Sequence, residues 1–258
     1  MFKYKILLLF VLACCTAIIK ANSISKAFSA LKIYDYFEAK QLFEKAMKSE
    51  TAAASYGLSI IYLRTDNHFS NIDSAYKFIF QSDSVFQTIT LKDKTAYLKY
   101  NVCQKSIDSV EKAVHAKAFE VYKSKNSIPE LEKFIAHYGS APQISEAIDL
   151  RNSIAYHDAL KTDTYQAYQL FMEKYPRSKE VPEAKEKYTF RFFQESTKNN
   201  TIKEYETYLE HVPHTPFLNE VENSIYTLST ANGKIKEYHN FIKKYPKNHN
   251  VATAWHNI

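Results

Sequence analysis

Nine histidines are the side chains of this 258-residue chain best suited to hold a metal ion, since neutral imidazole is a common metal ligand. The tightest spacings are His211 with His214, on either side of Pro213, and His249 with His256. The first pair has no acidic residue or cysteine at ligand spacing, and the H-E-x-x-H pattern of zinc proteases is absent from the chain. His211 and His214 are therefore predicted to lie in a solvent-exposed turn, and no metal site is expected.

Nucleophilic and acid–base chemistry also lacks a matching set of residues. No serine stands in a G-x-S-x-G elbow, and Cys103 is the only thiol beyond residue 21. A lone cysteine is commonly a small buried hydrophobe. Paired acids such as Glu183 with Glu186 and Glu204 with Glu206 stand among lysines, which is typical of exposed helix faces. The sequence predicts a protein that is not an enzyme, with no catalytic residues and no cofactor.

Glycine content and net charge argue against three further classes of protein. The chain has only 3 glycines, too few for a phosphate-cradling loop or for the turns of an all-β fold. Its net charge is +6, but Lys3, Lys5 and Lys20 lie in a leader that contains no acid. Without these lysines the count is 31 basic and 28 acidic side chains, a net charge of +3. No nucleic-acid partner is therefore expected.

The first 21 residues have the pattern of a Sec signal peptide. Two lysines precede an apolar run of about 14 residues, shorter than the ~20 that span a bilayer. Cleavage is predicted at Ala21. In the alternative, Val11-Leu12-Ala13-Cys14 resembles a bacterial lipobox, and Cys14 is lipidated. Both routes predict export to the periplasm or the outer membrane, with membrane contact only through a lipid anchor at Cys14.

An internal repeat is the strongest signal in the chain. Segments 128–138, 165–175, 202–212 and 235–245 carry apolar or aromatic residues at offsets 0, 3, 6, 7 and 10, which share one face of a helix. The predicted repeat core contains Leu131, Phe134, Tyr138, Tyr168, Phe171, Tyr175, Tyr205, Tyr208, Tyr238, Phe241 and Tyr245. A helix breaker follows each segment: Gly139, Pro176, Pro213 or Pro246. Each segment is therefore one amphipathic helix that ends at its breaker.

A second helix follows each breaker and completes the repeat unit. These helices are predicted at 143–160, 180–197 and 217–230, and the final copy stops partway through its second helix. Small residues lie at one position of the second helices, where helices pack closely: Ala147, Ala184, Val221 and Ala254. Successive units are 37, 37 and 33 residues apart, a period typical of helical solenoids.

Two earlier copies obey the same offsets. They are Tyr36, Ala39, Leu42, Phe43 and Ala46, then Ile72, Ala75, Phe78, Ile79 and Ser82. Between them and the later array, a long amphipathic helix is predicted over residues 105–125. The predicted organisation is a signal peptide at 1–21, N-terminal repeats with an irregular junction at 22–127, and C-terminal repeats at 128–258. The predicted fold is all-α, a solenoid of stacked antiparallel helix pairs.

These motifs resemble the tetratricopeptide (TPR-like) superfamily. Ala39, Phe43 and Ala46 match its A-x3-F-x2-A pattern, and the segments 171–176 and 241–246 resemble the F-[FLI]-x-x-Y-P signature of bacterial envelope TPR-like proteins. The resemblance implies a non-catalytic scaffold of the cell envelope that binds another protein or peptide. One alternative is the N-terminal stalk of a larger envelope protein whose activity lies beyond residue 258. Another is an enzyme with an α-superhelical domain.

Overall fold

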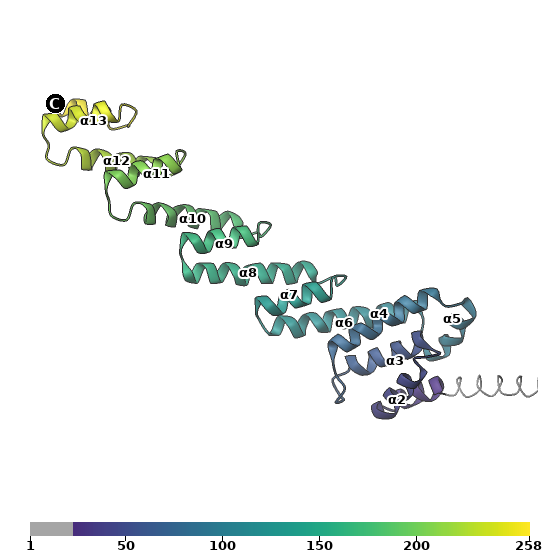
Figure 1. Ribbon diagram of the computed structural model, residues 1–258. Helices are drawn as coiled ribbons and strands as arrows, with labels where there is room; N and C mark the ends of the chain where they lie inside the picture. The colour runs from purple at the N-terminus through teal and green to yellow at the C-terminus, as the bar shows by residue number, and fades with distance from the viewer. Residues whose placement is uncertain (1–22) are drawn as a thin grey trace, which may run out of the picture. The chain divides into compact units, whose positions relative to one another are not determined.

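The computed structural model describes residues 23–258, and this part of the chain is helical, with no strand (Figure 1). The all-α prediction is confirmed. The predicted signal peptide, with Ala21 and Cys14, lies outside the described residues. Within them, no helix combines the length and the apolar character needed to span a bilayer.

The chain divides into two compact units, one ending at Arg151 and the other beginning at Asn152. The repeat register placed a boundary after residue 127, whereas the packing divides the chain inside a helix. Beyond a helical stretch at 23–32, the first unit contains α2 (Tyr36–Ala46), α3 (Thr51–Leu63), α4 (Ile72–Thr88), α5 (Leu91–Tyr97), η1 (Leu98–Tyr100), α6 (Gln104–Ser124), α7 (Ile128–His137) and the start of α8 (Ile144–Thr162). The second contains the rest of α8, α9 (Tyr165–Lys174), α10 (Val181–Ser196), α11 (Ile202–His211), α12 (Leu218–Ser229), α13 (Ile235–Lys244) and α14 (Val251–His256).

Helix α3 forms the centre of the first unit, where it packs against α2, α4 and α6. Its residues are almost all apolar or small, and those from Ala52 to Ser59 are buried on every side, as expected of a helix without a polar face. Gly57 makes this possible, because a Cβ atom there would lie 2.2 Å from a ring carbon of Phe43. Helix α6, predicted at 105–125, then packs on α4 and α7.

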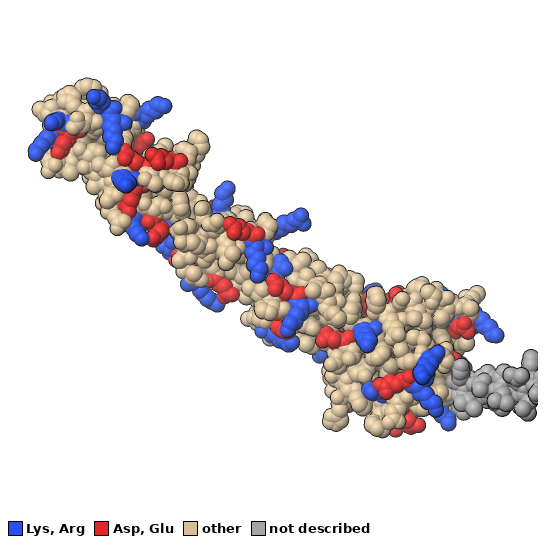
Figure 2. Space-filling view, in the orientation of Figure 1, with Lys and Arg blue, Asp and Glu red and all other residues tan. Residues whose placement is uncertain are grey.

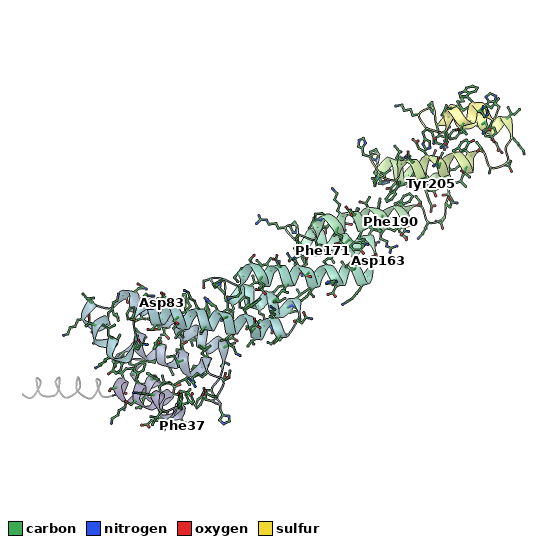
Figure 3. All side chains as sticks on the ribbon, turned by 180° about the vertical axis from the view of Figure 1, so that it is seen from behind. Phe37, Asp83, Asp163, Phe171, Phe190 and Tyr205 are labelled. Carbon is green, nitrogen blue, oxygen red and sulfur yellow. The ribbon has the colours of Figure 1, made fainter. Side chains whose placement is uncertain are left out.

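In the second unit, neighbouring helices pack in the pairs α9–α10, α11–α12 and α13–α14. One apolar cluster is centred on Phe171 and Tyr168, and another on Tyr208 and Phe241. Figure 3 labels Phe171 and Tyr205 among these side chains. The small residues Ala184, Val221 and Ala254 are each 0% exposed, which agrees with their predicted place at helix contacts.

In the second unit, a residue with a left-handed (positive φ) backbone conformation lies two residues before the first helix of each repeat. Asp163, Asn200 and Gly233 have φ angles of 48°, 52° and 66°. The Tyr168 hydroxyl donates a 2.7 Å hydrogen bond to Asp163, and the Tyr205 hydroxyl donates a 2.9 Å bond to Asn200. These turns fix the register of the tyrosine that follows five residues later.

Candidate functional site

The predicted repeat core is mostly buried. The structure places Leu131, Phe134, Tyr138, Tyr168, Phe171, Tyr175, Tyr205, Tyr208 and Phe241 at 0–7% exposure. Tyr238 and Tyr245, in the last copy, are only partly buried. The first column of the stripe lies at its edge, and Ile235 there is 57% exposed. The apolar face is therefore narrower than the five sequence offsets indicate.

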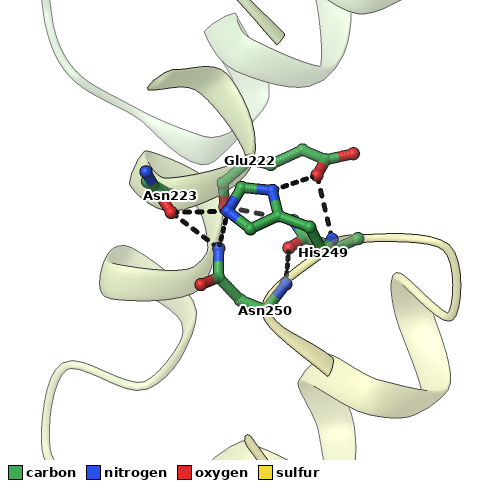
Figure 4. A network of polar contacts seen from close by, with 5 residues as sticks. Glu222, Asn223, His249 and Asn250 are labelled. Carbon is green, nitrogen blue, oxygen red and sulfur yellow. Dashed lines mark hydrogen bonds and ion pairs between the residues drawn. The ribbon is translucent and has the colours of Figure 1, made fainter. Parts of the chain in front are cut away.

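The histidines that the sequence singled out do not come together. No group of three or more histidine, cysteine, aspartate or glutamate side chains in the described chain is arranged to hold a metal ion. His249 belongs instead to a polar network that joins α12 to the turn before α14 (Figure 4). Its Nδ1 contacts Glu222, and its Nε2 lies 2.9 Å from Oδ1 of Asn223. The network holds this turn against the neighbouring helix.

Cys103 is the N-cap residue of α6, and Ser106 in the first turn of this helix bonds to it. Hydrogen bonds from the backbone and side chain of Ser106 lower the pKa of its thiol. Ser106 also donates a 2.8 Å hydrogen bond to the Cys103 carbonyl. The cysteine and serine form a capping box at the helix N-terminus. A structural role in capping explains this residue.

Two neighbouring cavities in the first unit share Asp73 and His137 as lining residues. We call these cavities the Asp73 site. One has a volume of about 400 Å³ and is lined by Asp73, Tyr122, Lys133, Ala136 and His137. The other has a volume of about 450 Å³ and is lined by Asp73, Ser74, Tyr76, Lys77, Phe80 and His137. Helices α4, α6 and α7 supply these residues, and the cavities are of a size that accepts a side chain or a small ligand.

Asp73 is held by two tyrosine hydroxyls. Tyr138 donates a 2.6 Å hydrogen bond and Tyr122 a 3.1 Å hydrogen bond, both to Oδ1 of Asp73. Burial and the neighbouring Asp73 raise the pKa of Tyr122 to about 12 and also raise the pKa of Tyr138. Both phenols are therefore neutral donors at physiological pH. No donor among the described residues bonds the second carboxylate oxygen, Oδ2.

Aromatic rings form the wall of the site. Tyr76 lies at the centre of this wall, with ring centroids 6.3 Å from Phe80, 5.3 Å from His137 and 4.6 Å from Tyr138. Phe80 is 62% exposed. Tyr76 and Phe80 are one turn apart on α4, and we call this pair the aromatic ledge. It offers apolar surface beside the Asp73 carboxylate.

His115, in α6, packs against Tyr76 of the aromatic ledge. It is 3% exposed, and its Nε2 has no hydrogen-bond partner among the described residues. Its ring centroid is 5.6 Å from that of Tyr76, and Glu111 Oε1 is 4.0 Å from Nε2. Desolvation by burial lowers the pKa of His115. The ring therefore packs as a neutral aromatic group.

The sequence did not reveal the Asp73 site. Asp73 reads as an ordinary acid in the first turn of a helix, and Tyr138 as a core residue of a different repeat. Only tertiary packing brings these residues together. The one available signal was Phe80, an aromatic residue next to the apolar column rather than in it.

Comparison with known proteins adds no relative to these observations. No family model matches the chain, and no curated protein sequence matches it either. The geometry of the described residues is therefore the basis for assigning a function.

Proposed function

We propose that this protein is a non-catalytic adaptor of the bacterial cell envelope, built as a TPR-like solenoid, that binds another protein or peptide at the Asp73 site. The repeat spacing and the packing of adjacent helices in pairs support the solenoid. The leader pattern at residues 1–21 supports export to the periplasm or the outer membrane.

One observation carries the binding proposal: Phe80 is 62% exposed on the same helix face as Asp73, whose Oδ2 accepts no hydrogen bond from the described residues. Binding surfaces of adaptors commonly combine an apolar anchor position with a few polar groups that orient the partner. In the Asp73 site, Phe80 supplies the apolar position and Asp73 the polar one.

The surface charge favours a protein partner over nucleic acid. On the face drawn in Figure 2, basic and acidic side chains are interspersed and no continuous basic stripe is visible. Nucleic-acid sites instead gather lysine and arginine into a patch or stripe.

Affinity capture from the envelope fraction tests this proposal. The full chain is immobilised as wild type, as Phe80→Ala, and as the control Leu91→Ala. Leu91 is 80% exposed in α5, away from the site, so its removal costs apolar surface without touching the ledge. The proposal expects a partner that is retained by wild type and Leu91→Ala and is reduced about fivefold or more by Phe80→Ala. Equal capture by all three chains contradicts it.

A further inference from the structure

We infer that the Asp73 site takes an arginine side chain of the partner polypeptide, with its guanidinium on Oδ2 of Asp73 and its stem along the aromatic ledge. This inference rests on the proposed adaptor function, because it names the chemistry of the segment that the adaptor binds.

The residues that carry the inference form one stripe of α4. Asp73, Tyr76 and Phe80 stand at positions i, i+3 and i+7, which lie on the same face of a helix. Asp73 and Phe80 are therefore separated by about 10 Å along the helix axis, at 1.5 Å per residue. A long side chain that enters over Phe80 runs along Tyr76 before its end reaches the carboxylate.

Asp73 and Lys77 are the two charged side chains lining the cavities that form no ion pair among the described residues, and both are exposed. Of the two lysines that line the cavities, Lys133 bonds to Glu130. The ammonium group of Lys77 lies 5.7 Å from the centre of the Phe78 ring. Asp73 Oδ1 is occupied by Tyr122 and Tyr138, whereas Oδ2 has no donor within the described chain. A cation that carries an N–H group can donate a hydrogen bond to this Oδ2 atom.

Arginine fits these surroundings better than lysine. Its guanidinium is planar and stacks on aromatic rings. It is also less strongly hydrated than an ammonium group, so it loses less hydration free energy on entering an aromatic-walled cavity. It also donates directional hydrogen bonds that match a carboxylate. The wall of Tyr76, Phe80 and His137 supplies the aromatic faces.

Three capped tripeptides test the inference by amide NMR spectroscopy of the full chain. They are acetyl-Leu-Arg-Leu-amide, the same peptide with citrulline in place of arginine, and the same peptide with glutamate. Citrulline keeps the shape and loses the charge. Binding of the arginine peptide is expected with a Kd on the order of 1 mM, as befits a fragment of this size. Its shift changes are expected to cluster at residues 73–80 and 137, and citrulline is expected to bind about tenfold more weakly.

Two variants separate charge from apolar contact. Asp73→Asn keeps an oxygen acceptor for Tyr122 and Tyr138, so the fold is expected to be retained. In this variant the arginine peptide is expected to bind only as weakly as the citrulline peptide binds to wild type. Phe80→Ala, at an exposed position, is expected to weaken the arginine and citrulline peptides alike. Asp149→Asn, an exposed carboxylate of α8, is the matched control and is expected to change neither affinity.

Each outcome decides the inference. Equal binding of arginine and citrulline peptides, tighter binding of the glutamate peptide, or an unchanged arginine affinity in Asp73→Asn would overturn it. If capture of the native partner still depends on Phe80 in that case, the adaptor function stands and only the arginine assignment fails. If capture is also independent of Phe80, the adaptor function at this site fails as well.

Discussion

The Tyr138 hydroxyl donates a 2.6 Å hydrogen bond to Asp73, a residue 65 positions earlier in the chain. Tyr138 is the C-cap residue of α7, and Asp73 lies in the first turn of α4. The bond therefore ties the last turn of one helix to the first turn of another. It also fixes the carboxylate at the point where the two cavities of the Asp73 site meet.

Removing this hydroxyl is expected to lower the stability of the first unit. Tyr138→Phe keeps the buried ring and leaves Asp73 with Tyr122 as its only tyrosine donor, so the free energy of unfolding is expected to fall by about 1–2 kcal/mol. Tyr122→Phe is the matched comparison and is expected to cost less, because its 3.1 Å bond is longer. Urea unfolding of the three chains measures the difference. A Tyr138→Phe variant as stable as wild type would show that the bond contributes nothing.

Stability is also expected to depend on pH through His115. Its folded pKa is lowered below 6.5 by burial, so the unfolded chain binds more protons, and the free energy of unfolding falls as pH decreases below about 6.5. The charged group facing the ring is Glu111, whose own pKa is raised by desolvation and by Asp83 and Asp108. Glu111 therefore acts in the opposite direction, gaining stability as pH falls through its raised pKa.

The variant His115→Leu isolates the histidine contribution. It keeps an apolar side chain between Tyr76 and Tyr138 and removes the titrating group. The loss of stability between pH 7 and pH 5.5 is expected to be smaller in this variant than in wild type, as measured by denaturant unfolding at each pH. The same slope in both chains would show that His115 is not the group responsible.

Two glycines offer a matched test of packing in the first unit. Gly57→Ala places a methyl group 2.2–2.5 Å from ring carbons of the fully buried Phe43, and it is expected to destabilise by about 1–3 kcal/mol. This loss outweighs the gain of about 1 kcal/mol that alanine brings to a helix. Gly139→Ala meets no atom closer than 4.0 Å and is expected to change stability little. A higher melting temperature for Gly57→Ala would mean that α3 does not pack on Phe43 as described.

A stabilising substitution is expected at the last left-handed turn. Gly233 has a φ of 66° and no side chain to accept from Tyr238, whereas Asn200 accepts a hydrogen bond from Tyr205 at the equivalent position. Gly233→Asn is expected to raise the free energy of unfolding of the second unit by about 0.5–1 kcal/mol, because asparagine tolerates this φ and supplies the acceptor. Gly233→Ala is expected to lower it, since alanine disfavours the conformation. Thermal unfolding of both variants distinguishes the two effects.

Much of the helical architecture is readable from local patterns. Helices α7, α9, α11 and α13 begin at the predicted residues, and each ends one residue before its predicted end. Threonine residues at the N-cap positions, Thr164 and Thr201, accept hydrogen bonds from the first turns of α9 and α11. Periodicity and capping are local properties, so one sequence is enough to place them.

The candidate site depended on contacts that no local pattern contains. Asp73, His115 and Tyr138 come from three helices, and their meeting is set by how α4, α6 and α7 pack. The exposure of Ile235 was missed for a related reason. An apolar residue at the edge of a stripe is buried only where a neighbouring helix covers it, and the sequence does not state how far that cover extends.

Photo-crosslinking in the native organism is the most direct test of the central claim, which is that the Asp73 site binds a polypeptide partner. The photo-reactive residue p-benzoylphenylalanine replaces Phe80 in one chain and Leu91 in another. Both positions are exposed and apolar, and only the first belongs to the site. A discrete polypeptide adduct formed from position 80 and absent from position 91 is the expected result. No adduct at position 80, or the same adducts from both positions, would contradict the claim.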